Sequence, residues 1–334
     1  MFKNVTRGTV LNRLLAAAAA VLTTFATLGT AQAQFPTKPL TMLVPYAAGG
    51  PTDTVARVTA QSMSKTLGQT VVVENKPSAG GILAPEQTKN AKPDGYTILI
   101  HHVGMATTPA LYRQLRFNPL TDFDYIGLIN DVPMTIIAKP NFPAKDFKEF
   151  LTYIKANKTK VTYANAGIGA ASHLCGMLFM SAIQTDMLTV PYKGTAPAMN
   201  DLLGGTVDFM CDQTTNTTAQ IKGGKVKVYG VTSLKRVASL PDVPTLDEQG
   251  LKGFEVGIWH GLYAPKGTPK EAIDKLSSAL QVAVKDPEVN KRFADLGATS
   301  YPPEKATPAA LGAHLKAEIE KWTPIIKKAG VYAD

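Results

Sequence analysis

Two glycine-containing turns have the residue types and the spacing of anion-binding sites. Residues 44–57 read VPYAAGGPTDTVAR, which is an apolar strand, a glycine pair, a proline, a hydroxyl residue and then a helical stretch. Residues 161–172 read VTYANAGIGAAS and repeat the order of strand, glycine turn and hydroxyl. A helix begins with unpaired backbone N–H groups and the positive end of its dipole, and glycines let the backbone approach an oxyanion. The hydroxyls of Thr52, Thr54 and Ser172 would add donors, so each turn predicts a site for a carboxylate, phosphate or sulfate.

The two turns also have a purely structural interpretation. Each could be an ordinary strand–helix turn, with glycine for its geometry and hydroxyl residues as helix caps. Their repetition favours binding, because the ligands of open α/β sheets lie outside the carboxyl ends of strands, where both turns would be. Two such turns, one in each half of the chain, could face each other across a cleft.

The sequence lacks the motifs of nucleotide binding and of the common hydrolases. Neither turn matches GxxxxGK[ST], or GxGxxG with an acidic residue at the required distance. There is no GxSxG elbow, and Ser172 and His173 are sequence neighbours, which rarely lets an imidazole take the serine proton. His101 and His102 would point to opposite faces of a strand, and no HExxH or Cys/His cluster follows them. We expect no catalytic residue, no metal site and no cofactor; an exported hydrolase that uses Ser172 or His173 is the enzymatic alternative.

The N-terminal residues have the pattern of a signal peptide. A basic start precedes an apolar, uncharged run over residues 14–28, and Ala31 and Ala33 are the small residues that a signal peptidase requires. We expect a signal peptide over residues 1–33, cleavage before Gln34 and export. A single membrane anchor is the alternative, although the run is short for a bilayer span.

The charge balance of the chain is moderately basic. The full chain carries 35 Lys and Arg against 26 Asp and Glu, a net charge of +9, and removal of the leader's three basic residues leaves +6. The basic residues form no run and are not interleaved with aromatic residues as in nucleic-acid binders. This excess favours attraction of anionic small molecules, and no nucleic-acid partner is expected.

Short β-branched runs alternate with amphipathic stretches after the leader. The alternation predicts an α/β fold in which helices cover parallel sheets, and the length favours two domains. The predicted strands are 40–44, 70–73, 96–100, 134–138, 161–163, 188–190 and 207–210. The main predicted helices are 54–67, 146–156, 173–182, 197–203, 270–285, 287–296 and 308–330.

The chain has two cysteines, Cys175 and Cys211. In an oxidising compartment this pair can close a disulfide. The alternative is two buried thiols that pack as small apolar groups. Their spacing does not match a CxxC redox or zinc motif.

Several motifs in order resemble the periplasmic substrate-binding proteins of tripartite tricarboxylate transporters, the Bug receptor family. Along the chain they are VPYAAGGPTD at 44–53, ENKP at 74–77 with GG at 80–81, PDGYT at 93–97, residues 163–174, residues 190–197, and LPDVPT at 240–245. The resemblance extends over essentially the whole chain after the leader. It implies a two-lobed, Venus-flytrap, type II-like periplasmic-binding-protein fold, in which each lobe is a mixed or parallel sheet flanked by helices.

The resemblance also implies domain boundaries and a function. Residues 34–138 and 259–334 would form lobe 1, and residues 139–258 would form lobe 2, with both crossovers after strand-like segments. The chain would be a monomeric periplasmic receptor that captures a di- or tricarboxylate and delivers it to membrane transporter subunits. A ligand-dependent partner of a membrane sensor kinase is an alternative that would have the same ligand site.

The same resemblance implies which residues hold the ligand. In that family the two turns hold a carboxylate through backbone N–H groups, hydroxyls and ordered water. Carried over residue by residue, the ligand-binding residues would be Tyr46, Ala48, Gly50, Thr52, Asp53, His102, Asn165, Gly169, Ala170, Ser172, His173 and Asp212. Asn165 and Ala170 stand where the family commonly has serines, and the His101–His102 pair replaces small hydroxyl residues. Specificity is expected to differ at these positions, where a bulkier, aromatic dicarboxylate would suit the site.

Overall fold

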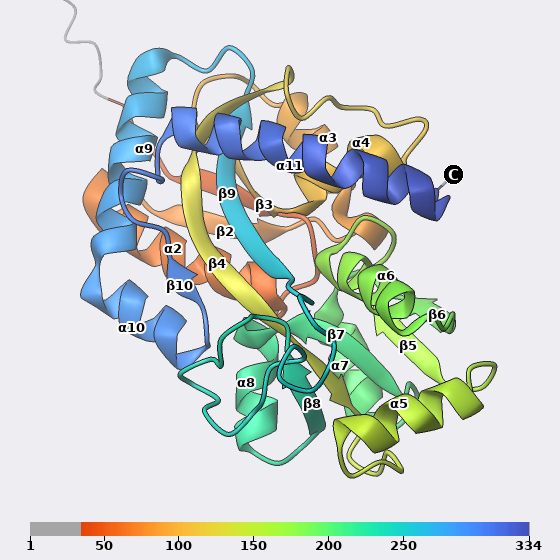
Figure 1. Ribbon diagram of the computed structural model, residues 1–334. Helices are drawn as coiled ribbons and strands as arrows, with labels where there is room; N and C mark the ends of the chain where they lie inside the picture. The colour runs from red at the N-terminus through yellow and green to blue at the C-terminus, as the bar shows by residue number, and fades with distance from the viewer. Residues whose placement is uncertain (1–34, 334) are drawn as a thin grey trace, which may run out of the picture. The chain divides into compact units, whose positions relative to one another are not determined.

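The computed structural model of the 334-residue chain describes residues 35–333, which form an α/β fold (Figure 1). The predicted signal peptide, residues 1–33, lies outside the described residues. Among the helices that are described, none is both long enough and apolar enough to cross a membrane.

The described strands are linked by hydrogen bonds in the order β2-β1-β3-β9-β4-β7-β5-β6, and β8 and β10 both pair with β4. β1 is parallel to β2 and β3, and β5 is parallel to β6 and β7. β4 and β9 run antiparallel to their neighbours and connect these two parallel groups. The strands are β1 Leu40–Val44, β2 Val71–Asn75, β3 Thr97–His102, β4 Phe123–Ala138, β5 Thr162–Asn165, β6 Leu188–Pro191, β7 Phe209–Gln213, β8 Lys227–Val231, β9 Gly257–Pro265 and β10 Thr299–Ser300.

Strand β4 changes partners along its length. From Phe123 to Pro133 it pairs with β9, and from Met134 to Ala138 it pairs with β7 and β8. The sequence predicted a strand only over 134–138, because glycine, asparagine, aspartate and proline interrupt the apolar pattern of the residues before it. Pairing with β9, which is distant in sequence, makes those residues a strand all the same.

Helices flank these strands, and α9 and α11 pack against β4 (Figure 1). The helix α2 packs against α9, and α6 packs against β7. The helical elements are α2 Pro51–Leu67, the 3₁₀ turn η1 Ala79–Gly81, α3 Leu83–Lys89, α4 Gly104–Leu111, α5 Phe147–Ala156, α6 Ala171–Ile183, α7 Thr195–Gly204, α8 Thr214–Lys222, α9 Lys270–Lys285, α10 Pro287–Asp295 and α11 Pro308–Ala329.

One continuous core extends under both parallel groups, but its composition differs between them. In β3, Ile98, Leu99 and Ile100 are all fully buried, as expected for a strand covered on both faces. The core around β7 is aromatic instead: the ring of Phe150 lies 5.2 Å from that of Phe209 and 4.3 Å from that of Tyr229, between centroids. Large aromatic side chains bury much apolar area at low entropic cost, so this core holds the shorter strands of the second group together.

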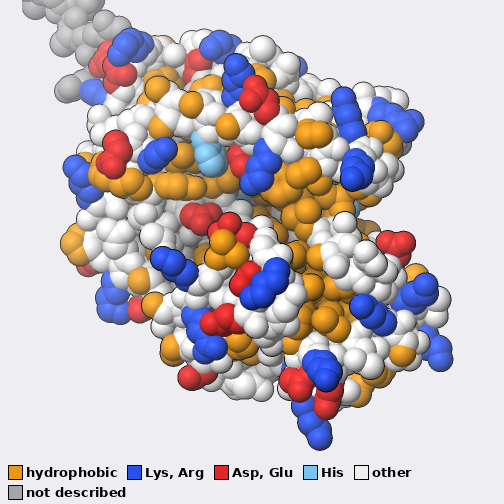
Figure 2. All heavy atoms as spheres, viewed as in Figure 1, with side chains coloured by type: hydrophobic (Ala, Val, Ile, Leu, Met, Phe, Trp, Pro, Cys, Tyr) orange, Lys and Arg blue, Asp and Glu red, His pale blue; other side chains and the backbone are white. Residues whose placement is uncertain are grey.

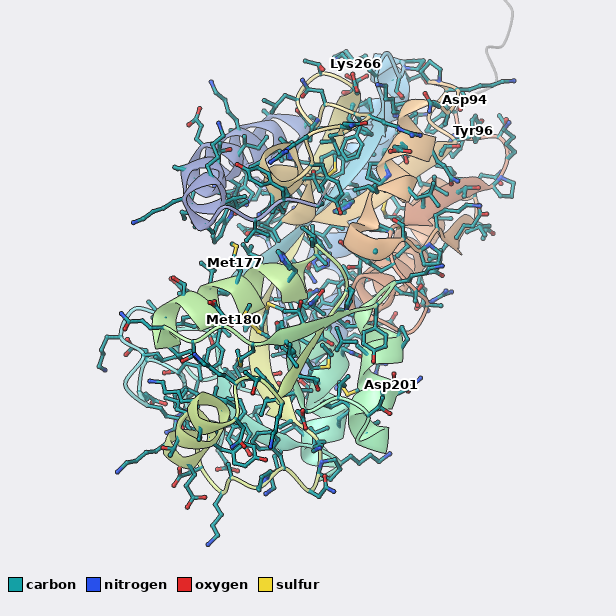
Figure 3. The ribbon with its side chains drawn as sticks, turned by 90° about the vertical axis from the view of Figure 1, so that its right-hand side faces the viewer. Asp94, Tyr96, Met177, Met180, Asp201 and Lys266 are labelled. Atoms are coloured by element: carbon teal, nitrogen blue, oxygen red, sulfur yellow. A yellow bond between two sulfur atoms is a disulfide. The ribbon has the colours of Figure 1, made fainter. Side chains whose placement is uncertain are left out.

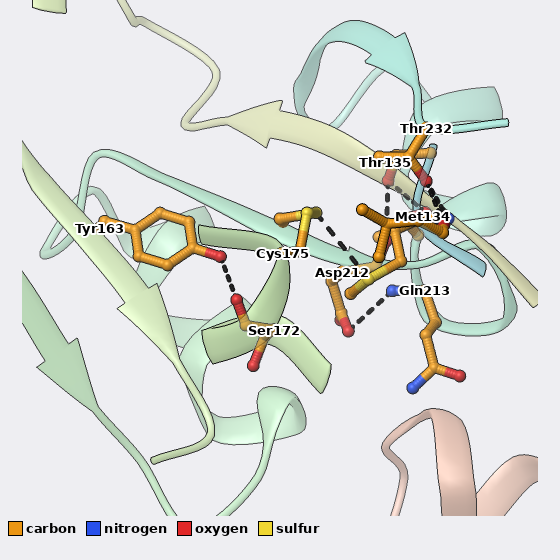
Figure 4. Close-up of a disulfide and its surroundings, with 11 residues drawn as sticks. Met134, Thr135, Tyr163, Ser172, Cys175, Asp212, Gln213 and Thr232 are labelled. Carbon is orange, nitrogen blue, oxygen red and sulfur yellow. Dashed lines mark hydrogen bonds between the residues drawn. A yellow bond between two sulfur atoms is a disulfide. The ribbon is translucent and has the colours of Figure 1, made fainter. Parts of the chain in front are cut away.

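Cys175 of α6 and Cys211 of β7 form a disulfide, and their Cα atoms are 6.1 Å apart (Figure 4). The bridge joins residues separated by 36 positions. In the chain-entropy model, a crosslink of that length lowers the entropy of the unfolded chain and so stabilises the fold by about 4 kcal/mol. Ser172 lies one helical turn before Cys175, and Asp212 directly follows Cys211. The disulfide therefore fixes the two elements that carry Ser172 and Asp212 relative to each other.

Candidate functional site

Both glycine turns contribute to one small, buried cavity. Its volume of about 20 Å³, counted as the space open to the centre of a water molecule, is room for one or two waters. The lining residues lie at or just after the ends of β1, β3, β5 and β7, or at the starts of α2, α6 and α7. They are Tyr46, Pro51, Thr52, His102, Ala166, Ala170, Ala171, Ser172, Thr195, Asp212 and Gln213.

Four helices begin at this cavity. Thr52 lies in the first turn of α2, Ser172 in the first turn of α6 and Thr195 at the start of α7, while Gln213 is the residue before α8. None of these four helix starts has a side-chain cap; those of α3, α4 and α9 also lack one, whereas the starts of α5, α10 and α11 are capped by side chains. The first-turn N–H groups around the cavity therefore have no partner within their own helices, and four positive dipole ends converge on it.

In the first turn, Thr52 and Tyr46 line the cavity but three other predicted residues, Ala48, Gly50 and Asp53, do not. The Thr52 hydroxyl lies 3.4 Å from Nε2 of His260, and the Tyr46 ring stacks on that of His102 with centroids 5.0 Å apart. Ala48 is exposed, and Gly50 is the residue before α2. Gly50 is buried but is not part of the lining.

Asp53 has a structural role in the first turn. It accepts hydrogen bonds from the backbone of Gly49 and from the side chains of Arg57 and Asn75. Burial raises the pKa of this carboxyl, but the bonds from Arg57, Gly49 and Asn75 outweigh burial and leave the pKa below its usual value. Asp53 is thus an ionised group that holds the turn and is not one of the cavity-lining residues.

In the second turn, Ala170 and Ser172 line the cavity. Ser172 Oγ accepts a hydrogen bond from the Ala166 backbone at 2.9 Å, so its own hydroxyl hydrogen is left to donate elsewhere. Asn165 is used locally, because its Oδ1 accepts from the Gly167 backbone N–H at 2.8 Å.

Gly169 and His173 lie outside the described lining of the cavity. The Gly169 carbonyl accepts a hydrogen bond from the Thr107 hydroxyl at 3.2 Å. Burial lowers the pKa of His173 to about 4, so its imidazole is neutral at pH 7.

Three buried histidines lie together beside the first turn. The rings of His101 and His102 have centroids 4.9 Å apart, and those of His102 and His260 are 5.9 Å apart. Burial lowers the pKa of His101 to about 4, that of His260 to about 3, and that of His102 well below its ordinary value. All three are therefore neutral at pH 7, and the described residues hold no cluster of His, Cys, Asp or Glu suited to a metal ion.

Asp212 is the ionisable acid of the cavity wall, and it is 1% exposed. Its Oδ1 accepts from the Gln213 backbone N–H at 2.9 Å, and its Oδ2 accepts from Nδ2 of Asn216 (Figure 4 shows the first bond). Burial raises the pKa of Asp212 to about 6, although the bonds from Asn216, Gln213 and Thr195 act in the opposite direction. The described lining includes no lysine or arginine that could pair with this acid.

Hydrogen bonds also join the second turn to η1 and to Tyr112, the residue after α4, next to the cavity. The Gly80 backbone donates to the Ala166 carbonyl at 3.0 Å, and the Tyr112 hydroxyl donates to the Ile168 carbonyl at 2.7 Å. A Cβ at Gly80 would collide with the Tyr112 hydroxyl and the Ile168 carbonyl oxygen. This close approach therefore requires glycine at position 80.

Sequence reasoning missed five lining residues: Pro51, Ala166, Ala171, Thr195 and Gln213. A signal existed for Thr195, because Gly194 precedes a helix that follows a strand, as in the two recognised turns. Gln213 had no comparable signal, since no glycine separates β7 from α8.

A family model described as the tripartite tricarboxylate transporter family receptor matches residues 55–331. The chain belongs to this receptor family. An Agrobacterium vitis protein from the TAR-I ttuE-ttuC' intergenic region is 52% identical over 300 residues, which are 90% of this chain and 87% of that protein. Protein BugT of Bordetella pertussis is 31% identical over 89% of this chain and 90% of its own length.

Solved structures of the family have the same fold. The periplasmic binding protein BugD is 57% identical with a TM-score of 0.87, covering 89% of this chain and 99% of that one. MatC from Rhodopseudomonas palustris, solved with bound malate, is 40% identical with a TM-score of 0.84, covering 87% and 100%. A second R. palustris protein, solved with adipate, is 29% identical with a TM-score of 0.84, covering 89% and 99%.

These comparisons confirm the resemblance and the fold class predicted from the sequence. The receptor family member described here has the two-lobed α/β fold of periplasmic binding proteins. It is a solute-binding receptor, and its family is a class of binding proteins.

Proposed function

We propose that this chain is a periplasmic receptor that captures an organic di- or tricarboxylate and delivers it to a tripartite tricarboxylate transporter. The observation that carries the proposal is the convergence of four uncapped helix N-termini on one buried cavity. Backbone N–H groups at helix starts bind carboxylates without a lysine or arginine, and the described lining has neither. The malate and adipate carried by two family members support the same ligand class.

The predicted site residues that line the cavity are the proposed ligand contacts. They are Tyr46, Thr52, His102, Ala170, Ser172 and Asp212, and Thr195 and Gln213 join them. Ala48, Gly50, Asp53, Asn165, Gly169 and His173 shape the surrounding turns, and their proposed role is to position the donors. The hydroxyls of Thr52 and Ser172 and the imidazole of His102 would supplement the helix N–H groups.

We propose that residues 34–138 and 259–334 form lobe 1 and residues 139–258 form lobe 2. The change of partners in β4 between Pro133 and Met134, and the start of β9 at Gly257, support a hinge near both boundaries. The cavity has room for only one or two waters, and a dicarboxylate is several times larger. The ligand would therefore reach its site only when the lobes separate, and closure would exclude water from it.

The proposed setting is the periplasm, after removal of residues 1–33, with the receptor acting as a monomer. Figure 2 shows Lys and Arg side chains scattered among Asp and Glu on one face, without a block of one sign. A receptor with this charge distribution can diffuse freely to a membrane transporter, whereas a protein that binds a polyanion would have a block of positive charge.

A thermal-shift screen of di- and tricarboxylates tests the proposal. The protein is first unfolded, dialysed and refolded, so that a co-purified acid cannot mask binding. A ligand at a hundred times its Kd stabilises the folded state by about 2.7 kcal/mol, which raises Tm by several degrees. A folded protein that no organic acid stabilises would contradict the carboxylate assignment.

Two further measurements separate the alternatives. Recovery of the bound acid unchanged, checked by mass spectrometry after prolonged incubation, argues against an exported hydrolase that uses Ser172 or His173. Loss of uptake in cells that lack the receptor supports transport, whereas intact uptake with loss of a ligand-induced response would favour a sensor-kinase partner.

A further inference from the structure

The polar groups of the cavity wall include one fixed hydrogen-bond acceptor. Both oxygens of Asp212 already accept one bond each, from the Gln213 backbone and from Asn216, and the Thr195 hydroxyl also bonds this carboxyl. A carboxylate oxygen has two lone pairs, so Asp212 can accept further bonds from a group in the cavity. Amide and hydroxyl neighbours can turn to donate or accept, but an ionised carboxylate can only accept.

The groups packed around Asp212 do not neutralise it. Asn216 on α8, Thr195 on α7 and Ser172 on α6 are uncharged, and Thr135 on β4 donates to the Asp212 carbonyl oxygen. The titratable side chains nearby are Tyr46, Tyr163, His102 and His173. Burial raises the pKa of both tyrosines and lowers the pKa of both histidines, so all four are uncharged between pH 5.5 and 7.5.

Binding of an unsubstituted dicarboxylate next to Asp212 is unfavourable. Its two carboxylates can be held by helix N–H groups, but its methylene chain has nothing to donate to Asp212. Closure would then bring two like-charged groups together in a site with little water, where repulsion is weakly screened. A hydroxyl or ammonium group on the ligand changes this balance, because it donates to the free lone pairs of Asp212.

We propose that Asp212 makes this receptor selective for carboxylates that carry a hydrogen-bond donor, a hydroxyl or an ammonium group, on the carbon chain. The inference rests on the proposed carboxylate-binding function and names the substrate class of that site. Selectivity of this kind is large when the protein group is buried, because a ligand without the donor leaves the acceptor unpaired.

Succinate, L-malate and L-aspartate form a matched test, because they differ only in the substituent on one carbon. Isothermal titration at pH 7.5 is expected to give at least a tenfold lower Kd for malate, for aspartate or for both than for succinate. A tighter fit of malate identifies a hydroxyl donor, and a tighter fit of aspartate identifies an ammonium. If the Kd values of all three acids agree within threefold, the selectivity proposal is wrong, but the chain can still be a carboxylate receptor. If no acid in the thermal-shift screen binds, the proposed function itself is wrong.

The Asp212→Asn variant tests whether this residue causes the selectivity. The two side chains have the same shape, and a flip of the Asn216 amide preserves the bond between positions 212 and 216. Succinate is expected to bind more tightly to the variant than to the wild type, and the preference for the substituted acid should fall below threefold. Asp201→Asn is the control, because Asp201 lies on α7 outside the described cavity lining and bonds the Tyr192 hydroxyl (Figure 3).

The pH dependence of malate and succinate binding to the wild type tests the role of Asp212 without a variant, and it applies if Asp212→Asn does not fold. Burial raises the pKa of Asp212 to about 6, so its carboxyl becomes a donor as the pH falls from 7.5 to 5.5. Malate and succinate titrate similarly, and the ratio of their Kd values cancels most of the ligand's own protonation. The Kd of succinate divided by the Kd of malate is expected to be at least threefold smaller at pH 5.5 than at pH 7.5. An unchanged or larger quotient at pH 5.5 would show that Asp212 is not the source of the preference.

Discussion

The backbone N–H of Gly104 donates to Nδ1 of His102 at 2.9 Å, and this bond fixes the imidazole tautomer. Nδ1 can accept only when it carries no proton, so the proton of neutral His102 is on Nε2. His101 is fixed in the same way, because its Nδ1 accepts from the His102 backbone at 2.9 Å. His102 therefore adds an uncharged N–H donor to the wall of the cavity.

Two substitutions at His102 separate this donor from the acceptor that binds Gly104. In His102→Asn the side-chain oxygen can replace Nδ1, but the donor at the position of Nε2 is lost. In His102→Gln the amide nitrogen can replace Nε2–H. Titration calorimetry should show carboxylate binding about 10- to 100-fold weaker in His102→Asn, the scale of a lost bond to a charged group, with most of the affinity retained in His102→Gln. Equal affinity of both variants and the wild type would mean that the ligand does not use this donor.

The hydroxyls of Ser172 and Thr52 are the next proposed donors. Ser172→Ala and Thr52→Ala should each weaken carboxylate binding by about 1–3 kcal/mol, because each leaves one ligand oxygen without a bond in a buried site. Thr54→Ala is the matched control, since the Thr54 hydroxyl donates to the Gly50 carbonyl in the same turn at 3.1 Å. If Thr52→Ala and Ser172→Ala bind as tightly as Thr54→Ala, the assignment of the cavity as the ligand site is wrong.

Closure of the proposed lobes depends on the close approach at Gly80. A Cβ there would displace the Tyr112 hydroxyl or the Ile168 carbonyl, so Gly80→Ala should disfavour the closed form. Stopped-flow measurements are expected to show weaker carboxylate binding, mainly through faster dissociation, because Gly80 is not part of the cavity lining. Gly68→Ala is the control: both glycines have φ near +70°, but a Cβ at Gly68 meets nothing within 4 Å. An equal loss in both variants would point to backbone strain and not to closure.

The Cys175–Cys211 disulfide should stabilise the folded chain without taking part in binding. Replacement of both cysteines by alanine is expected to lower the free energy of unfolding by about 2–5 kcal/mol, the usual range for a native bridge. Urea titration in the presence and absence of a reductant measures the effect, and the reductant should destabilise the wild type but not the variant. A variant as stable as the oxidised wild type would show that the bridge contributes nothing.

The glycine turns were predictable because their signal is local. The order of strand, glycine, hydroxyl and helix singled out Thr52 and Ser172, and both line the cavity. The structural role of Asp53 was also readable, since Arg57 follows it at the spacing of a helical ion pair, and the two groups are 2.9 Å apart. The family resemblance instead implied a ligand contact for Asp53, which is not part of the described cavity lining.

The histidine cluster could not be predicted, because it depends on pairing between distant strands. His102 of β3 lies opposite His260 of β9 in the antiparallel register. These two residues are far apart in sequence and come together only because β9 lies between β3 and β4 in the sheet. No local sequence pattern specifies that position of β9. The same holds for Gln213, which reaches the cavity because β7 pairs with β4.

The buried histidines should make the protein sensitive to acid. Burial lowers the pKa of His260 from 6.5 to about 3, so between these values the unfolded chain binds a proton that the folded chain excludes. The titration of His260 has no effect on stability above pH 6.5, where the imidazole is neutral in both states, and it destabilises the fold increasingly as the pH falls from 6.5 towards 3. His260→Gln should therefore reduce the slope of unfolding free energy against pH between 6 and 4 by about 1.4 kcal/mol per pH unit, the value for one proton. Urea titrations at several pH values measure this slope. A simple loss of packing at position 260 would lower the free energy of unfolding equally at every pH and leave the slope unchanged. An identical slope in wild type and variant would show that the fold does not hold His260 neutral.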